Sequence, residues 1–203
     1  LIPFLLDVRE GDCVLDACAA PGSKATEIAR WSRPGVVIAA DRRPKRLRQM
    51  LPLVRRLNRD NVLLLGADAA TPPFRTPFRR ILLDAPCSSL GTLRRNPDIK
   101  WRLSEEDLGA HAATERGLLE SCAGILAPGG TLVYATCSTE PEENEELVSD
   151  FLGGHPDFRI LPPPASFPEQ ARSRVGDDGA LRTFPERDDM DGYYAVLLSR
   201  SLT

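Results

Sequence analysis

Two cysteines of this chain follow short apolar runs, and they are the residues best suited to nucleophilic chemistry. Cys87 lies in Asp84-Ala85-Pro86-Cys87-Ser88-Ser89 after the apolar residues 81–83, and Cys137 lies in Thr136-Cys137-Ser138 after residues 131–133. Apolar runs bounded by Gly, Pro and charge are typical of buried strands in a parallel sheet. Ligands of such sheets bind beyond the carboxyl ends of the strands. We therefore predict that both thiols lie at one ligand-binding edge.

An earlier segment predicts a binding loop for an anionic group. Residues 14–18 indicate a first strand, and Ala19-Ala20-Pro21-Gly22-Ser23-Lys24 indicates a tight loop that opens a helix over 25–31. Small residues let the backbone approach a ligand closely, and Gly22 can adopt dihedrals that other residues avoid. Amide groups at a helix N-terminus favour an anion such as a carboxylate. A strand, turn and helix without any ligand would show a similar pattern, so both interpretations stay open here.

Two acids follow the next two predicted strands. Residues 36–41 end in Asp41, and an acid about 20 residues after a glycine loop is placed to accept hydrogen bonds from ribose hydroxyls. Residues 62–66 form a third predicted strand, and Asp68 after it is placed to reach a purine or its linkage. A solvent-facing loop carboxylate is the alternative for Asp68.

Alternating strands and helices predict an α/β fold with a doubly wound, mostly parallel sheet. A basic helix is expected over 42–58, with Leu47, Leu51, Val54 and Leu57 on one face. A long helix should begin at the N-cap Ser104 and include Ile125 and Leu126 before it stops at Pro128. Residues 139–142 have capping-box spacing for a further helix, whose N-terminus the following acids would stabilise. Residues 161–168 predict a surface crossing, and 193–198 a last strand.

Composition limits the classes of protein that fit. The chain has 203 residues and a net charge of −3, with 42% hydrophobic residues, which predicts one globular domain over 1–203. Five cysteines without a C-x-x-C pair argue against a disulfide framework and structural zinc, so no metal is expected and reduced thiols suggest the cytoplasm. No apolar run approaches membrane-spanning length, so no membrane partner is expected. The start at Leu1 suggests that the chain is cut from a longer protein.

The charges are unevenly distributed. One basic block covers residues 42–59 and another covers 94–102, whereas acids gather at 140–150 and 177–191. Basic blocks can form a face for a polyanion even when the net charge is slightly negative. Solvated helix faces are the alternative for the first block. The absence of G-x-x-x-x-G-K-[ST] excludes a P-loop, and the absence of G-x-G-x-x-G leaves a nicotinamide dehydrogenase with little support.

The motifs taken together resemble the Sun (Fmu) family of S-adenosylmethionine-dependent RNA cytosine-5 methyltransferases, and above all its bacterial small-subunit ribosomal RNA members. The resemblance covers about residues 14–198 and includes Asp191-Gly192-Tyr193-Tyr194 and the segment from Arg94 to Trp101. Ser23 stands where the family usually has a second glycine. The family's amino-terminal RNA-binding portion has no counterpart in this chain.

The resemblance implies a Rossmann-like class I methyltransferase fold and a set of site residues. The methionine end of S-adenosylmethionine would be wrapped by Cys18, Ala19, Ala20, Pro21, Gly22, Ser23 and Lys24. Asp41 and Arg46 would hold the ribose region, and Asp68 would contact the adenine side. Asp84 would lie between cofactor and base, with Cys137 as the nucleophile and Cys87 as the second cysteine. The resemblance implies RNA, and ribosomal RNA above all, as the partner. We expect the protein to be a monomer.

The implied reaction explains a need for two thiols. Carbon 5 of cytosine is too weak a nucleophile to take a methyl group from a sulfonium, and addition of a thiolate to carbon 6 makes it an enamine carbon. Cys87, or a base that it positions, would assist loss of the carbon-5 proton, and Asp84 would distinguish cytosine from uracil. A methyltransferase acting on a protein or a small molecule is one alternative. A non-catalytic, cofactor-binding scaffold for ribosome assembly is the other.

Overall fold

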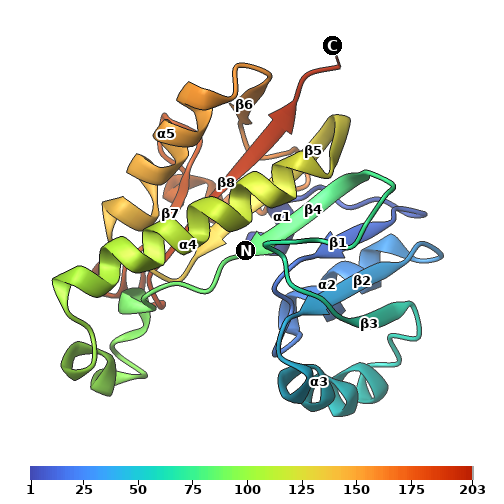
Figure 1. Ribbon diagram of the computed structural model, residues 1–203, viewed down its shortest axis with the longest axis horizontal. Coiled ribbons are helices and arrows are strands. Elements are labelled where there is room, and N and C mark those ends of the chain that lie inside the picture. Colours follow the sequence, from blue (N-terminus) through green and yellow to red (C-terminus); the bar gives the residue numbers. More distant parts are fainter. Residues whose placement is uncertain (203) are drawn as a thin grey trace.

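The computed structural model describes residues 1–202, apart from the side chain of Glu105, and places eight strands in one sheet with helices on both faces (Figure 1). The strands are β1 Val14–Asp16, β2 Val37–Asp41, β3 Val62–Gly66, β4 Phe78–Asp84, β5 Leu126–Thr136, β6 Phe158–Leu161, β7 Leu181–Thr183 and β8 Tyr193–Arg200. The α-helices are α1 Ile2–Leu5, α2 Ser23–Ser32, α3 Pro44–Arg56, α4 Glu105–Gly124, α5 Glu145–Gly154 and α6 Pro185–Asp188. Short 3₁₀ helices are η1 Leu90–Thr92, η2 Pro97–Trp101, η3 Pro141–Glu143 and η4 Glu169–Arg174.

The strand order is β3-β2-β1-β4-β5-β8-β6, and β7 also pairs with β8. Neighbours from β3 to β5 are parallel, whereas β8 runs antiparallel to β5, β6 and β7. The prediction of a doubly wound, mostly parallel sheet is confirmed. The order reverses between β1 and β4, and ligands of open α/β sheets bind at such a switch point. The carboxyl ends of β1 and β4 are therefore the expected site.

Two apolar layers enclose the sheet. Helices α1, α2 and α3 cover one face, where Ile28 and Met50 are fully buried. Helices α4 and α5 cover the other face, in front of the sheet in Figure 1, where Leu119 and Phe151 are buried. Cys122 lies in this second layer, so the thiol of α4 contributes to packing. Both layers leave the carboxyl ends of the strands open.

The end of α4 and the start of β5 differ from the sequence prediction. The helix stops at Gly124, and Leu126 already pairs with Phe78 of β4. The prediction that Ile125 and Leu126 are helical was therefore wrong, because apolar side chains suit a buried strand as well as they suit a helix. Pro128, expected to stop a helix, instead lies inside β5, where the register with β4 shifts between Phe78 and Arg80.

The basic helix and the acidic helix also differ in detail. In α3 the buried residues are Leu47, Met50 and Val54, while Leu51 and Leu57 are exposed, so the predicted apolar face was wrong at two of its four residues. The predicted capping box at 139–142 was wrong as well, because η3 intervenes and α5 begins only at Glu145. The surface crossing at 161–168 includes the buried Phe167, and β6 and β7 were not predicted.

Among residues 1–202, no helix combines the length and the apolar character that a membrane crossing needs.

Candidate active site

The two predicted thiols meet at the edge of the sheet. The Sγ atoms of Cys87 and Cys137 are 3.2 Å apart, and their loops follow β4 and β5, in which Asp84 pairs with Ala135. The backbone N–H of Cys137 donates to Cys87 Sγ at 3.2 Å. Ser89 Oγ lies 3.3 Å from Cys137 Sγ, and Ser89 holds a left-handed backbone with φ of 63°. The prediction that both thiols reach one edge is confirmed.

The two thiols differ in acidity. Hydrogen bonds from Cys87 and, to a lesser extent, from the Ser89 hydroxyl lower the pKa of Cys137 to about 7, against the effect of burial. The same contact with Cys137, together with burial, raises the pKa of Cys87. A thiol with a pKa near 7 is about half thiolate at neutral pH, whereas a free cysteine is only a few per cent thiolate. The arrangement therefore favours ionisation of Cys137 over ionisation of Cys87.

An ion pair lies at the carboxyl end of β4. Lys24 Nζ is 2.6 Å from Asp84 Oδ2, and Tyr193 places its ring 5.6 Å from the same ammonium group. Burial raises the pKa of Asp84, and Lys24 opposes that shift. Burial also opposes the charge on Lys24, but Asp84 raises its pKa above the ordinary value. Two residues that the sequence placed in separate roles are therefore one charged pair beside the thiols.

The small-residue loop opens α2 through a left-handed glycine. Gly22 has φ of 107° and immediately precedes Ser23, the first residue of the helix. The dihedral requires glycine there, whereas the 2.8 Å contact of a Cβ atom with Met50 Cε involves the end of a flexible side chain. Ser23 is not among the residues with positive φ. Serine in place of the family's second glycine therefore needs no unusual backbone.

The predicted ribose acid is fixed by its neighbours. Asp41 is buried at the end of β2, accepts the Arg43 N–H at 2.8 Å and forms an ion pair of 3.3 Å with Arg46. Arg46 also donates to the carbonyl of Ala20, so it joins the acid to the small-residue loop. Asp68 is exposed beyond the neighbouring β3 and accepts the N–H of Ala70 in its own loop. The structure thus brings Asp41, Arg46 and the loop together, with Asp68 on the adjacent strand end.

Three residues near this edge were not singled out by the sequence analysis. Asp16, at the end of β1, is fully buried, and neither carboxyl oxygen has a hydrogen-bond partner among the described residues. Burial, followed by the charge of Asp84, raises the pKa of Asp16 to about 8. Ser89 and Glu143 are the other two. Position in a strand-end motif could have identified Asp16, but only the folded chain shows the contacts of Ser89 and Glu143.

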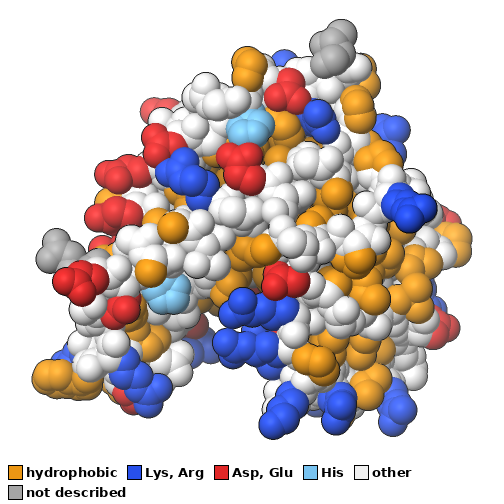
Figure 2. Space-filling model, viewed as in Figure 1, with side chains coloured by type: hydrophobic (Ala, Val, Ile, Leu, Met, Phe, Trp, Pro, Cys, Tyr) orange, Lys and Arg blue, Asp and Glu red, His pale blue; other side chains and the backbone are white. Residues whose placement is uncertain are grey.

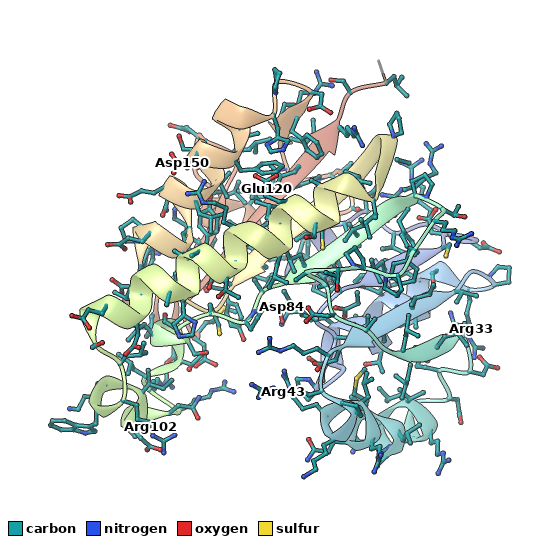
Figure 3. The ribbon with its side chains drawn as sticks, viewed as in Figure 1. Arg33, Arg43, Asp84, Arg102, Glu120 and Asp150 are labelled. Atoms are coloured by element: carbon teal, nitrogen blue, oxygen red, sulfur yellow. The ribbon has the colours of Figure 1, made fainter. Side chains whose placement is uncertain are left out.

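The labelled side chains of Figure 3 outline the surroundings of the site. In this view Asp84, at the sheet edge, lies above Arg43, which precedes α3, while Arg102, which follows η2, lies lower and to the left. Figure 2 shows a hollow at the same edge with Lys and Arg side chains on its rim. A separate cavity of about 340 Å³ opens beside Lys24 and Tyr193, with Phe4 and Met190 among its lining residues. The site is therefore open, and its rim is basic.

Fold and site together define the class of protein. A doubly wound sheet with its switch point between β1 and β4, a glycine loop that opens α2 and an acid at the end of β2 are the features of a Rossmann-like class I methyltransferase. The chain belongs to the family of the 16S rRNA methyltransferases RsmB/F, whose family model matches residues 3–199. The resemblance to the Sun family is thereby confirmed.

Individual relatives agree with this assignment. The chain is 38% identical over 199 residues to ribosomal RNA small subunit methyltransferase B of Erwinia tasmaniensis, covering 96% of this chain and 43% of the relative. It is also 38% identical over 200 residues to the protein of that name in Vibrio vulnificus, covering 97% of this chain and 44% of the relative. The chain thus spans less than half the length of these curated relatives.

Solved structures show the same fold. The NSun6 protein from Pyrococcus horikoshii, crystallised with SFG, matches with a TM-score of 0.85 at 28% identity. The match covers 100% of this chain and 51% of the NSun6 chain. A methyltransferase homolog protein from Pyrococcus horikoshii has a TM-score of 0.81 at 32% identity, covering 98% of this chain and 64% of its own.

Proposed function

We propose that this chain is the catalytic portion of an enzyme that transfers a methyl group from S-adenosylmethionine to carbon 5 of a cytosine in small-subunit ribosomal RNA. The observation that carries the proposal is the pair of thiols 3.2 Å apart, of which Cys137 has a pKa near 7. Methyl transfer to a protein or small molecule has no use for such a pair. Membership in the family and the names of the relatives support the substrate class.

The residues at the switch point fit S-adenosylmethionine, which would supply the methyl group. Residues 18–24 would hold its methionine end, Asp41 and Arg46 its ribose, and Asp68 its adenine side. The unpartnered carboxyl group of Asp16 supports this fit, because a buried carboxyl without a donor is satisfied by a cationic ligand, and S-adenosylmethionine carries an ammonium and a sulfonium.

The chain's own residues would act on the base in a fixed order. The thiolate of Cys137 would add to carbon 6, and the electron pair of the ring double bond would become available at carbon 5 to take the methyl group, whose bond to the sulfonium sulfur would break with its electron pair left on that sulfur. The proton on carbon 5 then leaves to a base, and its bonding pair restores the double bond as the carbon–sulfur bond breaks. We expect Cys87, protonated and in contact with Cys137, to assist by donating a hydrogen bond to the sulfur of Cys137 as it departs. Asp84, held by Lys24, is placed to accept a hydrogen bond from the exocyclic amine of cytosine.

Substitution of each cysteine tests the proposal. Cys137→Ala should be inactive and should form no RNA-linked protein, because no sulfur remains to add to the base. Cys87→Ala should still add and transfer the methyl group but resolve the adduct slowly, so a covalent complex with substrate RNA should survive denaturing electrophoresis when S-adenosylmethionine is present.

Cys122→Ala, which removes a packing thiol, is the control and should behave like the wild type. A trapped complex in Cys137→Ala instead would reverse the two roles. Full activity in both single variants would exclude the covalent mechanism.

A further inference from the structure

Behind the two cysteine loops lies a buried pair of carboxyl groups that the proposed reaction does not use. Glu143 ends η3 and Glu115 lies in the middle of α4, and both side chains are fully buried. A carboxyl oxygen of Glu115 and one of Glu143 lie within 4.8 Å of each other. The acids after residue 139 were predicted to stabilise a helix N-terminus, and this prediction was wrong for Glu143, whose side chain is buried.

Glu143 holds the residue that follows Cys87. Its Oε1 accepts the backbone N–H of Ser88 at 2.7 Å, and its Oε2 accepts the Ser88 hydroxyl at 2.5 Å. Ser88 Oγ is also 3.1 Å from Ser138 Oγ, and Ser138 directly follows Cys137. One carboxylate therefore links the residues next to both thiols. The 3.2 Å approach of the sulfurs depends on how these two loops are held.

Glu115 lies close to Glu143 and shares a partner with it. Its Oε2 accepts the Tyr134 hydroxyl at 3.3 Å, whereas its Oε1 has no donor among the described residues. The same hydroxyl lies 2.7 Å from the carbonyl oxygen of Glu143. Burial and a nearby like charge both disfavour the ionised form of a carboxyl group. Burial, followed by the charge of Glu143 and the hydrogen bond to it, raises the pKa of Glu115 to about 9.

We propose that Glu143 and Glu115 form a proton-sharing pair that positions the cysteine loops, with ionised Glu143 anchoring Ser88 and neutral Glu115 donating its proton to Glu143. Both are positioning residues, since neither touches the thiols directly. The other titratable groups that face the pair are His111 from α4, Tyr134 from β5 and the two cysteines. The link to catalysis rests on the proposed function, but the positioning itself does not.

Alkylation of Cys137 tests the positioning without RNA or cofactor. The rate of iodoacetamide reaction at Cys137 would be followed by peptide mass spectrometry from pH 5.5 to 9.5, with the exposed Cys13 replaced by serine throughout. In Glu143→Gln and Ser88→Ala the midpoint of the pH profile of alkylation should rise from about 7 toward the ordinary pKa of a cysteine. A full shift to about 8.5 would slow alkylation at pH 7 about 15-fold.

The matched control is Glu142→Gln, an exposed neighbour in the same 3₁₀ helix, which should keep the wild-type midpoint. Glu115→Gln should keep it as well, because the amide still donates to Glu143. Wild-type midpoints in both Glu143→Gln and Ser88→Ala would overturn the proposal. So would an equal shift in Glu142→Gln.

Thermal melting tests the shared proton. A carboxyl group whose pKa is raised on folding stabilises the folded state fully below its unfolded pKa, and that contribution is lost as pH rises to the folded pKa. The wild type should therefore lose stability relative to Glu115→Gln between about pH 4.5 and 9, so that the difference in Tm grows across this range. A constant difference would contradict a neutral Glu115. A rise in Tm with Zn²⁺ or Mn²⁺ that His111→Ala abolishes would replace the shared proton by a metal ion and overturn the proposal.

Discussion

At the scale of single residues, the difference in pKa between the two thiols depends on which groups hydrogen-bond to each sulfur. Cys87 receives the N–H of Cys137, and the Cys137 thiol is hydrogen-bonded to Cys87 and, as donor, to the Ser89 hydroxyl oxygen; once ionised, its sulfur accepts from both. Hydrogen bonds to a charged form lower the pKa of an acid. Ser89 holds its hydroxyl there from a left-handed backbone, a conformation that costs about 1 kcal/mol or more for a residue with a Cβ atom. Strain at this position is consistent with a functional role for the hydroxyl.

Ser89→Ala and Ser89→Gly should therefore both raise the pKa of Cys137 above about 7 and slow its alkylation at pH 7 several-fold. Glycine adopts the left-handed backbone without strain, so Ser89→Gly should lose the hydroxyl effect while it keeps or gains stability. The pH profile of alkylation and a melting curve measure the two effects separately. Ser149→Ala on the exposed face of α5 is the control. An unchanged midpoint in both Ser89 variants would assign the acidity of Cys137 to Cys87 alone.

Asp16 gives a second prediction at this scale. Burial raises its pKa from 3.8 to about 8, so its contribution to stability is present at low pH and is lost as pH rises through that range. Asp16→Asn should remove the loss, and its Tm should gain on that of the wild type between about pH 4 and 8. Added S-adenosylmethionine should stabilise the wild type more than the variant if a cation of the ligand meets this carboxylate. Parallel Tm curves for the two proteins would show that Asp16 does not titrate in this range.

At the scale of elements, patterns with local causes were predictable. Strand β3 begins and ends where its apolar run does, and Pro44 opens α3 at the position where its ring is tolerated. The end of α4 was not predictable, because Leu126 belongs to a strand only once Phe78 lies beside it. The same limit applies to β6 and β7, which are short and depend on pairing with β8.

The candidate site divides in the same way. Residues such as Asp41, Asp84 and the two cysteines were predictable because each ends or closely follows an apolar run. Glu143 and Ser89 were not, since their partners lie 55 and 48 residues away in the sequence. The acids after residue 139 are also typical of a helix N-terminus, so nothing in the sequence distinguished the buried Glu143 from its exposed neighbours.

The loops after β4, β5 and α6 pack through a pair of glycines. The N–H of Gly91 donates to the Cys137 carbonyl at 3.0 Å, and the N–H of Gly192 donates to the Gly91 carbonyl at 2.7 Å. A Cβ atom at Gly91 would lie 2.3 Å from the Gly192 carbonyl oxygen, so backbone would have to move.

Gly91→Ala should therefore destabilise the protein by about 1–3 kcal/mol and weaken the contact between the cysteine loops. Urea unfolding measures the first effect, and the alkylation midpoint of Cys137 measures the second. Gly109→Ala in α4 meets nothing within 4 Å and should be neutral or stabilising, which makes it the matched control. Equal stabilities for the two variants would contradict the close approach.

At the scale of the whole molecule, a net charge of −3 coexists with a basic rim at the open edge of the sheet (Figure 2). Exposed basic residues line both sides of this rim. One group lies at the start of α3 and consists of Arg42, Arg43 and Lys45; the other follows β4 and consists of Arg94, Arg95 and Arg102. Two of the latter pair with Asp189 and Asp191, which joins the loop after β4 to the segment before β8. Trp101 ends η2 with 81% of its surface exposed and the Lys100 ammonium 4.8 Å from its ring. An exposed indole among cations is the combination that stacks on single-stranded bases.

RNA binding by this chain should accordingly be weak and should fall steeply with salt, and two substitutions should separate its components. Arg102→Ala should make the slope of log K against log salt shallower by about 0.7–0.9, because one phosphate contact is lost. Trp101→Ala should weaken binding by about 1–3 kcal/mol and leave the slope unchanged, because stacking releases no counterions. Fluorescence anisotropy with a labelled single-stranded RNA at several salt concentrations measures both. Leu202→Ala is the control, since Leu202 is also 81% exposed but lies near the C-terminus, away from this rim (Figure 1). Binding that ignores salt, or a Trp101→Ala variant that binds like the wild type, would remove this rim from the RNA-binding surface.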